Sequence, residues 1–297
     1  MKKVVLEMGG SDAAIVCEEA DLDIASSGVL WGGMANCGQN CNAIERVILL
    51  KHSAAEFTER LMAKMKNIRI GDGMDRGTDM GPLASASQKQ KMESIVRKCK
   101  ARGSQCLAGG EGIAGRAGYF FQPTLLYQHR SDAFPTDEEI FGPILMAACV
   151  KDDEEAVRLA NQSPFGLAAS VWTGNRRRGE TIARKLECGS VMINDCVVSF
   201  GITESNWTGI KRSGIGWVHG EKGLDEMVNL QYINADPQNH IQKFWWFPYS
   251  EGMVRGMKAA MQFLHSSRLR KRIRALPAVF RHFTAYLLTN RIRSDKV

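Results

Sequence analysis

A thiol and a carboxylate that could work as a pair stand thirty-four residues apart near the start of the chain. Glu7 lies in Leu-Glu-Met-Gly-Gly, beside a flexible pair of glycines, and Cys41 lies in Gly-Gln-Asn-Cys, among small and amide residues. A thiolate is a strong nucleophile toward a carbonyl carbon, and a nearby carboxylate can take a proton from the thiol or from water. The two stretches therefore predict two-step acyl chemistry through a thioester, with Cys41 as nucleophile and Glu7 as general base.

Each of these residues also has a simpler interpretation. Cys41 could be a buried structural cysteine, which is the usual fate of a free cysteine, and Glu7 could be a solvated carboxylate at the end of a strand. A zinc site is disfavoured, because Cys37 and Cys41 have no second pair of ligands nearby. The eight cysteines show no disulfide-rich spacing, so a reducing cytoplasm is the setting that we expect.

The elements that must position the pair follow from the alternation of strand-like and helix-like segments. Glu7 is expected at the end of a short first strand, and Cys41 in the loop between a helix and a buried strand. Strands are predicted at 14–17, 46–50, 170–173 and 190–194, and helices at 22–36, 55–65, 87–101, 152–162 and 179–186. This alternation predicts an α/β fold with a mainly parallel sheet.

Six more blocks follow the two stretches in order along the chain. They run from Gly71 to Leu83 and from Gly118 to Leu125, then through Glu138–Pro143, residues 161–173, Gly189–Asn194 and Ser213–Gly216. With the stretches around Glu7 and Cys41, they make residues 4 to about 234 resemble the aldehyde dehydrogenase superfamily. The expected fold is then an aldehyde dehydrogenase-like catalytic domain, followed by a helical basic extension.

The resemblance implies a mechanism and a cofactor, NAD or NADP. Cys41 would attack a small-molecule aldehyde, its own backbone N–H would stabilise the oxyanion, and hydride would leave to the nicotinamide. Water activated by Glu7 would then hydrolyse the thioester. Glu139 would hold the nicotinamide ribose and Phe141 would pack near the ring, although a core phenylalanine and a helix-start charge are the simpler alternative. Asn194 would lie near the active site and order loops there; no metal is implied.

Some parts of the family pattern differ in this chain. An aromatic-glycine loop of the family lies near the aldehyde entrance, and here it contains Trp207 within Ser205–Gly209, which leaves the substrate preference open. Ser11 stands where the family usually has a lysine after the glycine pair. The family's second oxyanion donor, an upstream asparagine, has no counterpart in this chain.

The resemblance also implies how the chain is divided. The expected parts are residues 1–7, the last strand of a cofactor-binding domain; 8–208, the catalytic domain; 209–236, a returning segment with an oligomerisation strand at 227–235; and 237–297, the basic extension. Family members carry most of a Rossmann-type domain before the Glu7 motif, so we expect a fragment of a longer protein that forms homo-oligomers. The alternative is a truncated, oxidation-deficient polypeptide with residual thioester or esterase chemistry.

The charge of the chain is concentrated in its last part. The net charge is +7, but residues 251–297 alone hold eleven Lys or Arg against two Asp or Glu, which gives +9 there and −2 elsewhere. Aromatics at 244–247 precede an amphipathic stretch, the basic run 268–274, Pro277 and a second amphipathic piece through Leu288. Residues 240–297 could lie on an anionic membrane surface, or their apolar face could pack on the body or on a partner subunit. No nucleic-acid-binding module accompanies the charge.

Overall fold

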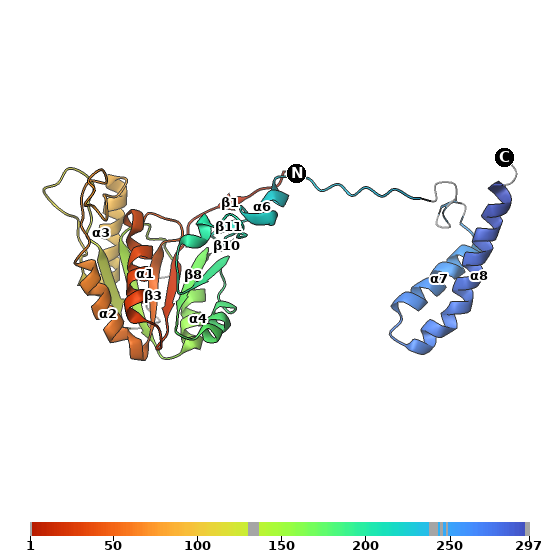
Figure 1. Ribbon diagram of the computed structural model, residues 1–297, viewed down its shortest axis with the longest axis horizontal. Coiled ribbons are helices and arrows are strands. Elements are labelled where there is room, and N and C mark those ends of the chain that lie inside the picture. The colour runs from red at the N-terminus through yellow and green to blue at the C-terminus, as the bar shows by residue number, and fades with distance from the viewer. Residues whose placement is uncertain (1, 130–136, 238–242, 244–245, 248, 295–297) are drawn as a thin grey trace. The chain divides into compact units, whose positions relative to one another are not determined.

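The computed structural model describes residues 2–129, 137–237, 243, 246–247 and 249–294, with side chains in the last helix described as far as residue 282 (Figure 1). The chain divides into two compact units, Met1–Leu230 and Gln231–Val297. Each unit is described by itself.

A seven-stranded sheet forms the centre of the first unit, in the order β4-β5-β6-β3-β2-β8-β9. All neighbouring strands are parallel except β4, which is antiparallel to β5 at one edge. The strands are β2 Asp12–Val16, β3 Ile44–Leu50, β4 Gln105–Ala108, β5 Thr124–Gln128, β6 Ile144–Val150, β8 Ala168–Trp172 and β9 Ser190–Ile193. The predicted α/β fold with a mainly parallel sheet is confirmed.

Helices cover the sheet. The cysteine loop, residues 35–43 with Cys41, lies at one end of the sheet. The helices are α1 Leu22–Met34, α2 Lys51–Met65, α3 Ala86–Ala101, α4 Asp153–Asn161 and α5 Arg176–Ala183. Every residue of β2 and β3 is buried, as expected of central parallel strands with both faces covered. Side chains of Asp21, Ser85 and Asp152 accept backbone N–H groups and begin α1, α3 and α4. Two helix starts lie earlier than predicted, because α2 follows β3 directly and Asn175 caps α5.

Two small antiparallel ladders lie outside the central sheet and join segments that are far apart in the sequence. β1 Leu6–Glu7 pairs with β11 Gly214–Ile215, and β7 Phe165–Gly166 pairs with β10 Ile210–Lys211. The first ladder confirms a short strand at Glu7. Helix α6 Gly220–Glu226 follows.

The strand predicted at 227–235 is not formed within this chain. The segment is extended but belongs to no described ladder, since the side chains of Leu230, Tyr232 and Ile233 are 78–88% exposed and no neighbouring strand accompanies it. A strand needs a hydrogen-bonding partner, and this single chain supplies none among the residues that the structure describes. The role of the segment in oligomers therefore stays a prediction, as do the predicted domain boundaries.

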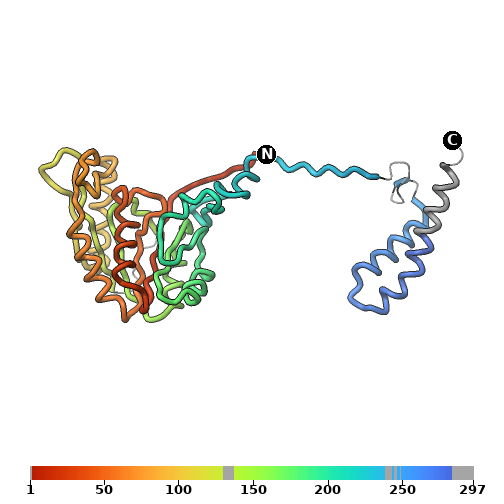
Figure 2. Tube along the Cα trace, viewed as in Figure 1, coloured from red at the N-terminus to blue at the C-terminus, as the bar shows by residue number. Residues whose placement is uncertain are grey.

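The second unit is a helical hairpin. Helix α7 Glu251–His265 begins at the Ser250 cap and packs along α8 Leu269–Ser294; Figures 1 and 2 show the two side by side. Pro277, expected between two pieces, lies inside α8, where it removes one backbone donor but does not end the helix. Of the predicted aromatic run 244–247, residues 244 and 245 lie outside the described residues. No helix in the described part of the chain is long and apolar enough to cross a membrane.

Candidate active site

The glycine pair after Glu7 joins the cysteine loop to the Glu139 segment. Gly10 packs so closely on the cysteine loop that a Cβ there would lie 2.2 Å from the carbonyl oxygen of Cys41. The N–H of Gly10 donates to Glu139 Oε1 at 3.1 Å, and a Cβ on Gly9 would lie 2.5 Å from Glu139 Oε2. Only residues without a side chain allow both approaches, so this pair brings two predicted site residues to one place.

Cys41 lies half-buried beside an apolar cluster. Its side chain packs against the cluster of Leu167, Ala168 and the fully buried Trp207. Burial raises the pKa of the Cys41 thiol, and the carboxylates of Asp12 and Glu7 raise it further. The backbone N–H groups of Asn42 and of Cys41 itself act in the opposite direction. The thiol is therefore protonated at neutral pH and needs a base, while N–H donors already face the sulfur.

The cysteine loop has a defined shape because several backbone contacts hold it. Asn36 and Cys37 have left-handed conformations, with φ of 52° and 60°, in the short turn that ends α1. Gly38 (φ 67°) approaches the backbone of Gly142 so closely that a Cβ would lie 2.3 Å from its carbonyl oxygen. Beside the nucleophile, Asn42 Nδ2 donates to the carbonyl of Val197 at 2.9 Å.

Glu7 faces the same place from the first ladder. Its residue is exposed, and Trp207 Nε1 donates to Glu7 Oε2 at 2.8 Å. Since Trp207 belongs to the apolar cluster against which Cys41 packs, this cluster connects the predicted base with the predicted nucleophile. We did not expect this role for Trp207 from the sequence. The only signal was its unusual loop.

The Glu139 segment has neither of the simpler features considered above. No helix begins at Glu139, whose carboxylate instead accepts from the glycine pair, and Phe141 is only half-buried. Phe141 has a left-handed backbone with φ of 54°, which is unfavourable for a residue with a Cβ. The two backbone amides of Ile140 and Phe141 donate to one buried carboxyl oxygen, Oε1 of Glu45, at 2.7 and 2.8 Å.

Glu45 and its neighbour Arg46 were missed as site residues, because they lie in what reads as an apolar strand. Arg46 is buried and donates to the carbonyls of Ser11, Leu159 and Ala160 at 2.8–3.2 Å. These bonds join β3 to the start of β2 and to the end of α4. The strand that follows the cysteine loop, β3, which we call the cysteine strand, is thereby fixed to the segments on both sides.

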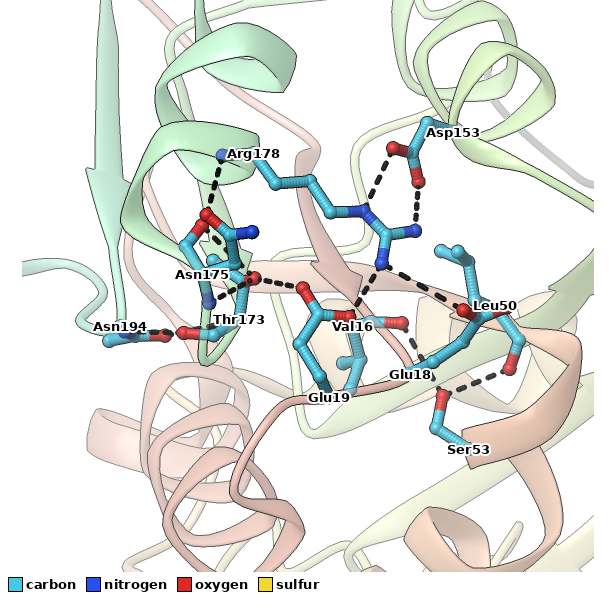
Figure 3. A network of polar contacts seen from close by, with 10 residues as sticks. All are labelled: Val16, Glu18, Glu19, Leu50, Ser53, Asp153, Thr173, Asn175, Arg178 and Asn194. Carbon is cyan, nitrogen blue, oxygen red and sulfur yellow. Dashed lines mark hydrogen bonds and ion pairs between the residues drawn. The ribbon is translucent and has the colours of Figure 1, made fainter.

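Asn194 belongs to a polar network at the carboxyl ends of the strands (Figure 3). Its Oδ1 accepts the N–H of Thr173, and its Nδ2 donates to the Thr173 carbonyl, each at 2.8 Å. The hydroxyl of Thr173 donates to Glu19, which Arg178 joins to Asp153. Both ends of the Asn194 amide therefore order strand ends rather than reach for a substrate. The loop after Asn194 returns to the cysteine loop three residues later, at the bond from Asn42.

The arrangement matches a known family of enzymes. The family model described as the aldehyde dehydrogenase family matches residues 1–233. The chain belongs to the aldehyde dehydrogenase family. The succinate semialdehyde dehydrogenase [NAD(P)+] Sad of Escherichia coli (strain K12) is 38% identical over 241 residues, which are 80% of this chain and 50% of the relative. The chloroplastic betaine aldehyde dehydrogenase of Beta vulgaris is 33% identical over 248 residues, 83% of this chain and 49% of the relative.

Solved structures of aldehyde dehydrogenases have the same fold. Lactaldehyde dehydrogenase from Escherichia coli superposes with a TM-score of 0.71 at 34% identity, over 75% of this chain and 46% of that one. A betaine aldehyde dehydrogenase mutant from Staphylococcus aureus in complex with NAD+ has a TM-score of 0.70 at 33% identity, over 75% and 45%. This aldehyde dehydrogenase family chain thus spans about half the length of the curated relatives that it matches.

Proposed function

We propose that this chain carries the nucleophile and general base for NAD(P)-dependent oxidation of an aldehyde to a carboxylate. The observation that supports this most is the position of Gly10, which contacts the cysteine loop on one side and Glu139 on the other. Glu7 is three residues before Gly10, and its charge acts on the Cys41 thiol. One short segment therefore brings nucleophile, base and cofactor contact into one site.

The chemistry proceeds through Cys41. Its sulfur, once deprotonated, attacks the aldehyde carbon, and the new C–S bond leaves an oxyanion that the Cys41 N–H can stabilise. The oxidised nicotinamide, when bound, supplies the acceptor for the hydride that leaves this carbon. Glu7 then takes a proton from water, the water oxygen attacks the thioester carbonyl, and the C–S bond breaks. The products are the carboxylate and the restored cysteine.

The residues present fit a nicotinamide cofactor. The carboxylate of Glu139 lies at the surface of the glycine pair, where a ribose with two hydroxyl donors could replace or share the Gly10 contact. The choice between NAD and NADP stays open, because the relatives include enzymes named for NAD(P)+ and for NADP(+).

Turnover by the full chain tests the proposal. The chain is mixed with NAD+ or NADP+ and with succinate semialdehyde or betaine aldehyde, the aldehydes for which relatives are named. We expect reduced cofactor to form, and Cys41→Ala to abolish this while Cys106→Ala, a half-buried cysteine on β4, keeps it. Equal turnover by Cys41→Ala would overturn the assignment of the nucleophile.

An activated ester separates oxidation from the residual chemistry. If the chain forms an acyl adduct on Cys41 with the ester but never reduces cofactor, it is the oxidation-deficient form with only thioester or esterase activity. Mass spectrometry of the intact chain and of its Cys41 peptide measures the adduct directly. Acylation at cysteines other than Cys41 would contradict the site.

Self-association is proposed to use the extended segment at 227–235. Its apolar side chains, including Tyr232 and Ile233, are exposed, and its unpaired backbone can accept a strand from a second copy. Sedimentation velocity should show an oligomer for the wild type and a smaller species for Ile233→Asp. The control is Leu224→Asp, which changes a leucine on α6 that is 70% exposed, against 78% for Ile233. Equal sedimentation of the wild type and Ile233→Asp would contradict the proposal.

A second candidate function, peripheral contact with an anionic membrane, rests on the helical hairpin. Met261 and Leu264 on α7 and Ile273 on α8 are 57–59% exposed, and residues 251–297 carry a net charge of +9. An exposed apolar face with a basic face is typical of interfacial helices. We expect the chain to sediment with phosphatidylserine vesicles and Met261→Asp to weaken this. Ile24→Asp on α1 is the control, and binding that ignores vesicle charge would contradict the idea.

A further inference from the structure

The mechanism gives no role to Glu45, a buried carboxyl group next to the site. Glu45 lies four residues after Cys41 on β3, at the centre of the sheet, and is 2% exposed. A carboxyl group in such a place is costly unless it is neutral or fully hydrogen-bonded. Its Oε1 accepts the N–H groups of Ile140 and Phe141 at 2.7 and 2.8 Å. These residues directly follow Glu139, so Glu45 joins the cysteine strand to the cofactor-contact segment.

The other oxygen of Glu45 faces a buried serine hydroxyl. Glu45 Oε2 and Ser11 Oγ are both buried without a hydrogen-bond partner among the described residues, and the Ser11 hydroxyl affects the pKa of Glu45, so the two groups are neighbours. In the neutral acid, Oε1 is a carbonyl acceptor for two amides and Oε2–H is a donor that Ser11 Oγ can accept. The carboxylate would pair the same two atoms, with the Ser11 hydroxyl donating to Oε2, and this is the contact that lowers the pKa of Glu45. Ser11 therefore pairs with Glu45 in both forms, and burial decides between them.

Burial, more than the surrounding charges, favours the neutral acid. The charged groups around Glu45 are Asp12, Arg46 and Glu139. The carboxylate of Glu139 repels a charge on Glu45, and the guanidinium of Arg46 is directed to backbone carbonyls. Burial, the largest cause, raises the pKa of Glu45 to about 8, against the lowering effects of the Phe141 N–H and Ser11.

We propose that Glu45 is a positioning residue that, as a neutral acid, clamps the Glu139–Phe141 segment to the cysteine strand and releases it when the acid ionises. The meaning of this clamp for cofactor binding rests on the proposed function. The clamp itself rests on the two amide bonds and the facing serine. It also explains how Phe141 keeps its unfavourable left-handed backbone, since the amides on both sides of Ile140 are held by one oxygen.

The direction of the pH effect follows from linkage. An open segment exposes Glu45 to water, where its pKa returns to about 4.5, whereas in the closed segment it is about 8. Between these values opening releases a proton, so the opening constant rises by up to about tenfold per pH unit. Below about pH 4.5 and above about pH 8, the opening constant should no longer change with pH.

Amide hydrogen exchange tests the clamp without any turnover. Exchange of the peptide around Ile140 and Phe141 is followed by mass spectrometry on the full chain from pH 5 to 9, relative to the same peptide unfolded. We expect wild-type protection to fall with pH up to about 8. Glu45→Gln, which keeps an acceptor and a donor in the same places, should stay protected at every pH. Equal pH dependence in the two proteins would overturn the proposal.

Two further variants keep the test decisive if Glu45→Gln does not fold. Gln88 on α3 donates to the carbonyls of Ile140 and Phe141, so Gln88→Ala loosens the same segment but should leave the pH dependence in place. Ser11→Ala removes a hydroxyl that lowers the pKa of Glu45, so it should move the levelling-off to higher pH. If Ser11→Ala levels off at the same pH as the wild type, Glu45 is not the titrating group. The same holds if protection in Gln88→Ala no longer depends on pH.

Kinetics separate this proposal from the proposed function. In an active chain, the KM for the cofactor should rise with pH in the wild type and less in Glu45→Gln, with kcat changing little. A structural defect would change both constants at all pH values. If pH-dependent protection is found but no variant reduces cofactor, the clamp stands and the proposed oxidation fails. If turnover is normal and protection does not depend on pH, the reverse holds.

Discussion

Replacing Gly10 by alanine should move Cys41, the proposed nucleophile, without changing it chemically. The added Cβ would lie 2.2 Å from the carbonyl oxygen of Cys41 and 3.3 Å from both Asp12 Oδ1 and Leu167 Cβ. Ordinary contacts begin near 3.4 Å, so the backbone at Cys41 must shift by roughly 1 Å, because backbone has no rotamer with which to avoid the clash.

The expected cost falls on reactivity more than on folding. A displacement of about 1 Å at a reacting group lowers rates by about 10²-fold, whereas overpacking of this size costs about 1–3 kcal/mol of folding free energy. The rate at which an activated ester acylates Cys41 measures the first effect, and urea unfolding measures the second. We expect acylation of Gly10→Ala to be slower by about two orders of magnitude while the chain stays folded.

Gly9→Ala is the matched control. Its Cβ would meet the carboxylate of Glu139 at 2.5 Å, and this is the end of a flexible side chain that can turn away. Acylation of Cys41 should then remain within about threefold of wild type, since little strain reaches the cysteine loop, while the KM for the cofactor rises. A folded Gly10→Ala chain that acylates as fast as Gly9→Ala would refute the idea that Gly10 positions Cys41.

Further perturbations test other contacts of the site and fold. Alkylation of Cys41 should keep accelerating above pH 9.0, the usual thiol pKa, because burial and nearby carboxylates raise its pKa; a plateau below that pH would contradict this. Trp207→Phe removes the donor to Glu7 and should slow deacylation by about fivefold, seen as a larger burst of acyl adduct. Arg178→Met should lower the free energy of unfolding by about 1–2 kcal/mol in urea, a modest value because the side chain is 25% exposed. For Glu45 the folded pKa is raised from 4.5 to about 8, so wild-type stability should fall between these pH values by a few kcal/mol relative to Glu45→Gln.

The predictable part of the fold is the part that local patterns determine. The strands now seen as β2 and β3 end in the apolar runs 13–16 and 47–50, typical of parallel strands covered on both faces, and both were predicted to within two residues. Helix starts at Asp21 and Asp152 could be found because a side-chain cap is a local signal. The start of α2 has no side-chain cap, and there the prediction was four residues late.

The segment at 227–235 and Pro277 show where local patterns do not decide. The family resemblance predicts a strand at 227–235, but a strand also needs a neighbour, and this chain offers none in its described part. Pro277 would normally end a helix, yet α8 continues through it while packing along α7. In both places the structure depends on which partner is present rather than on propensity.

The candidate site was only half predictable for the same reason. Cys41, Glu7 and Glu139 could be selected from motifs, but the contacts that position them join residues far apart in the chain. Trp207 reaches Glu7 across 200 residues, and Glu45 reaches the amide of Phe141 across 96. Neither contact leaves a periodic or capping signal in the sequence.

A charged residue inside an apolar strand is nevertheless a signal that could have been used. The buried strand predicted at 46–50 already contains Arg46, and Glu45 directly before it also enters the core once the strand begins one residue earlier. A buried acid needs hydrogen-bond donors, and the nearest supply is backbone N–H groups that are outside helices and ladders. Such free amides occur in irregular segments like the one after Glu139, which is where the structure places them. The acid that the apolar pattern made easy to overlook is thus the residue that joins β3, the strand after Cys41, to the segment that follows Glu139.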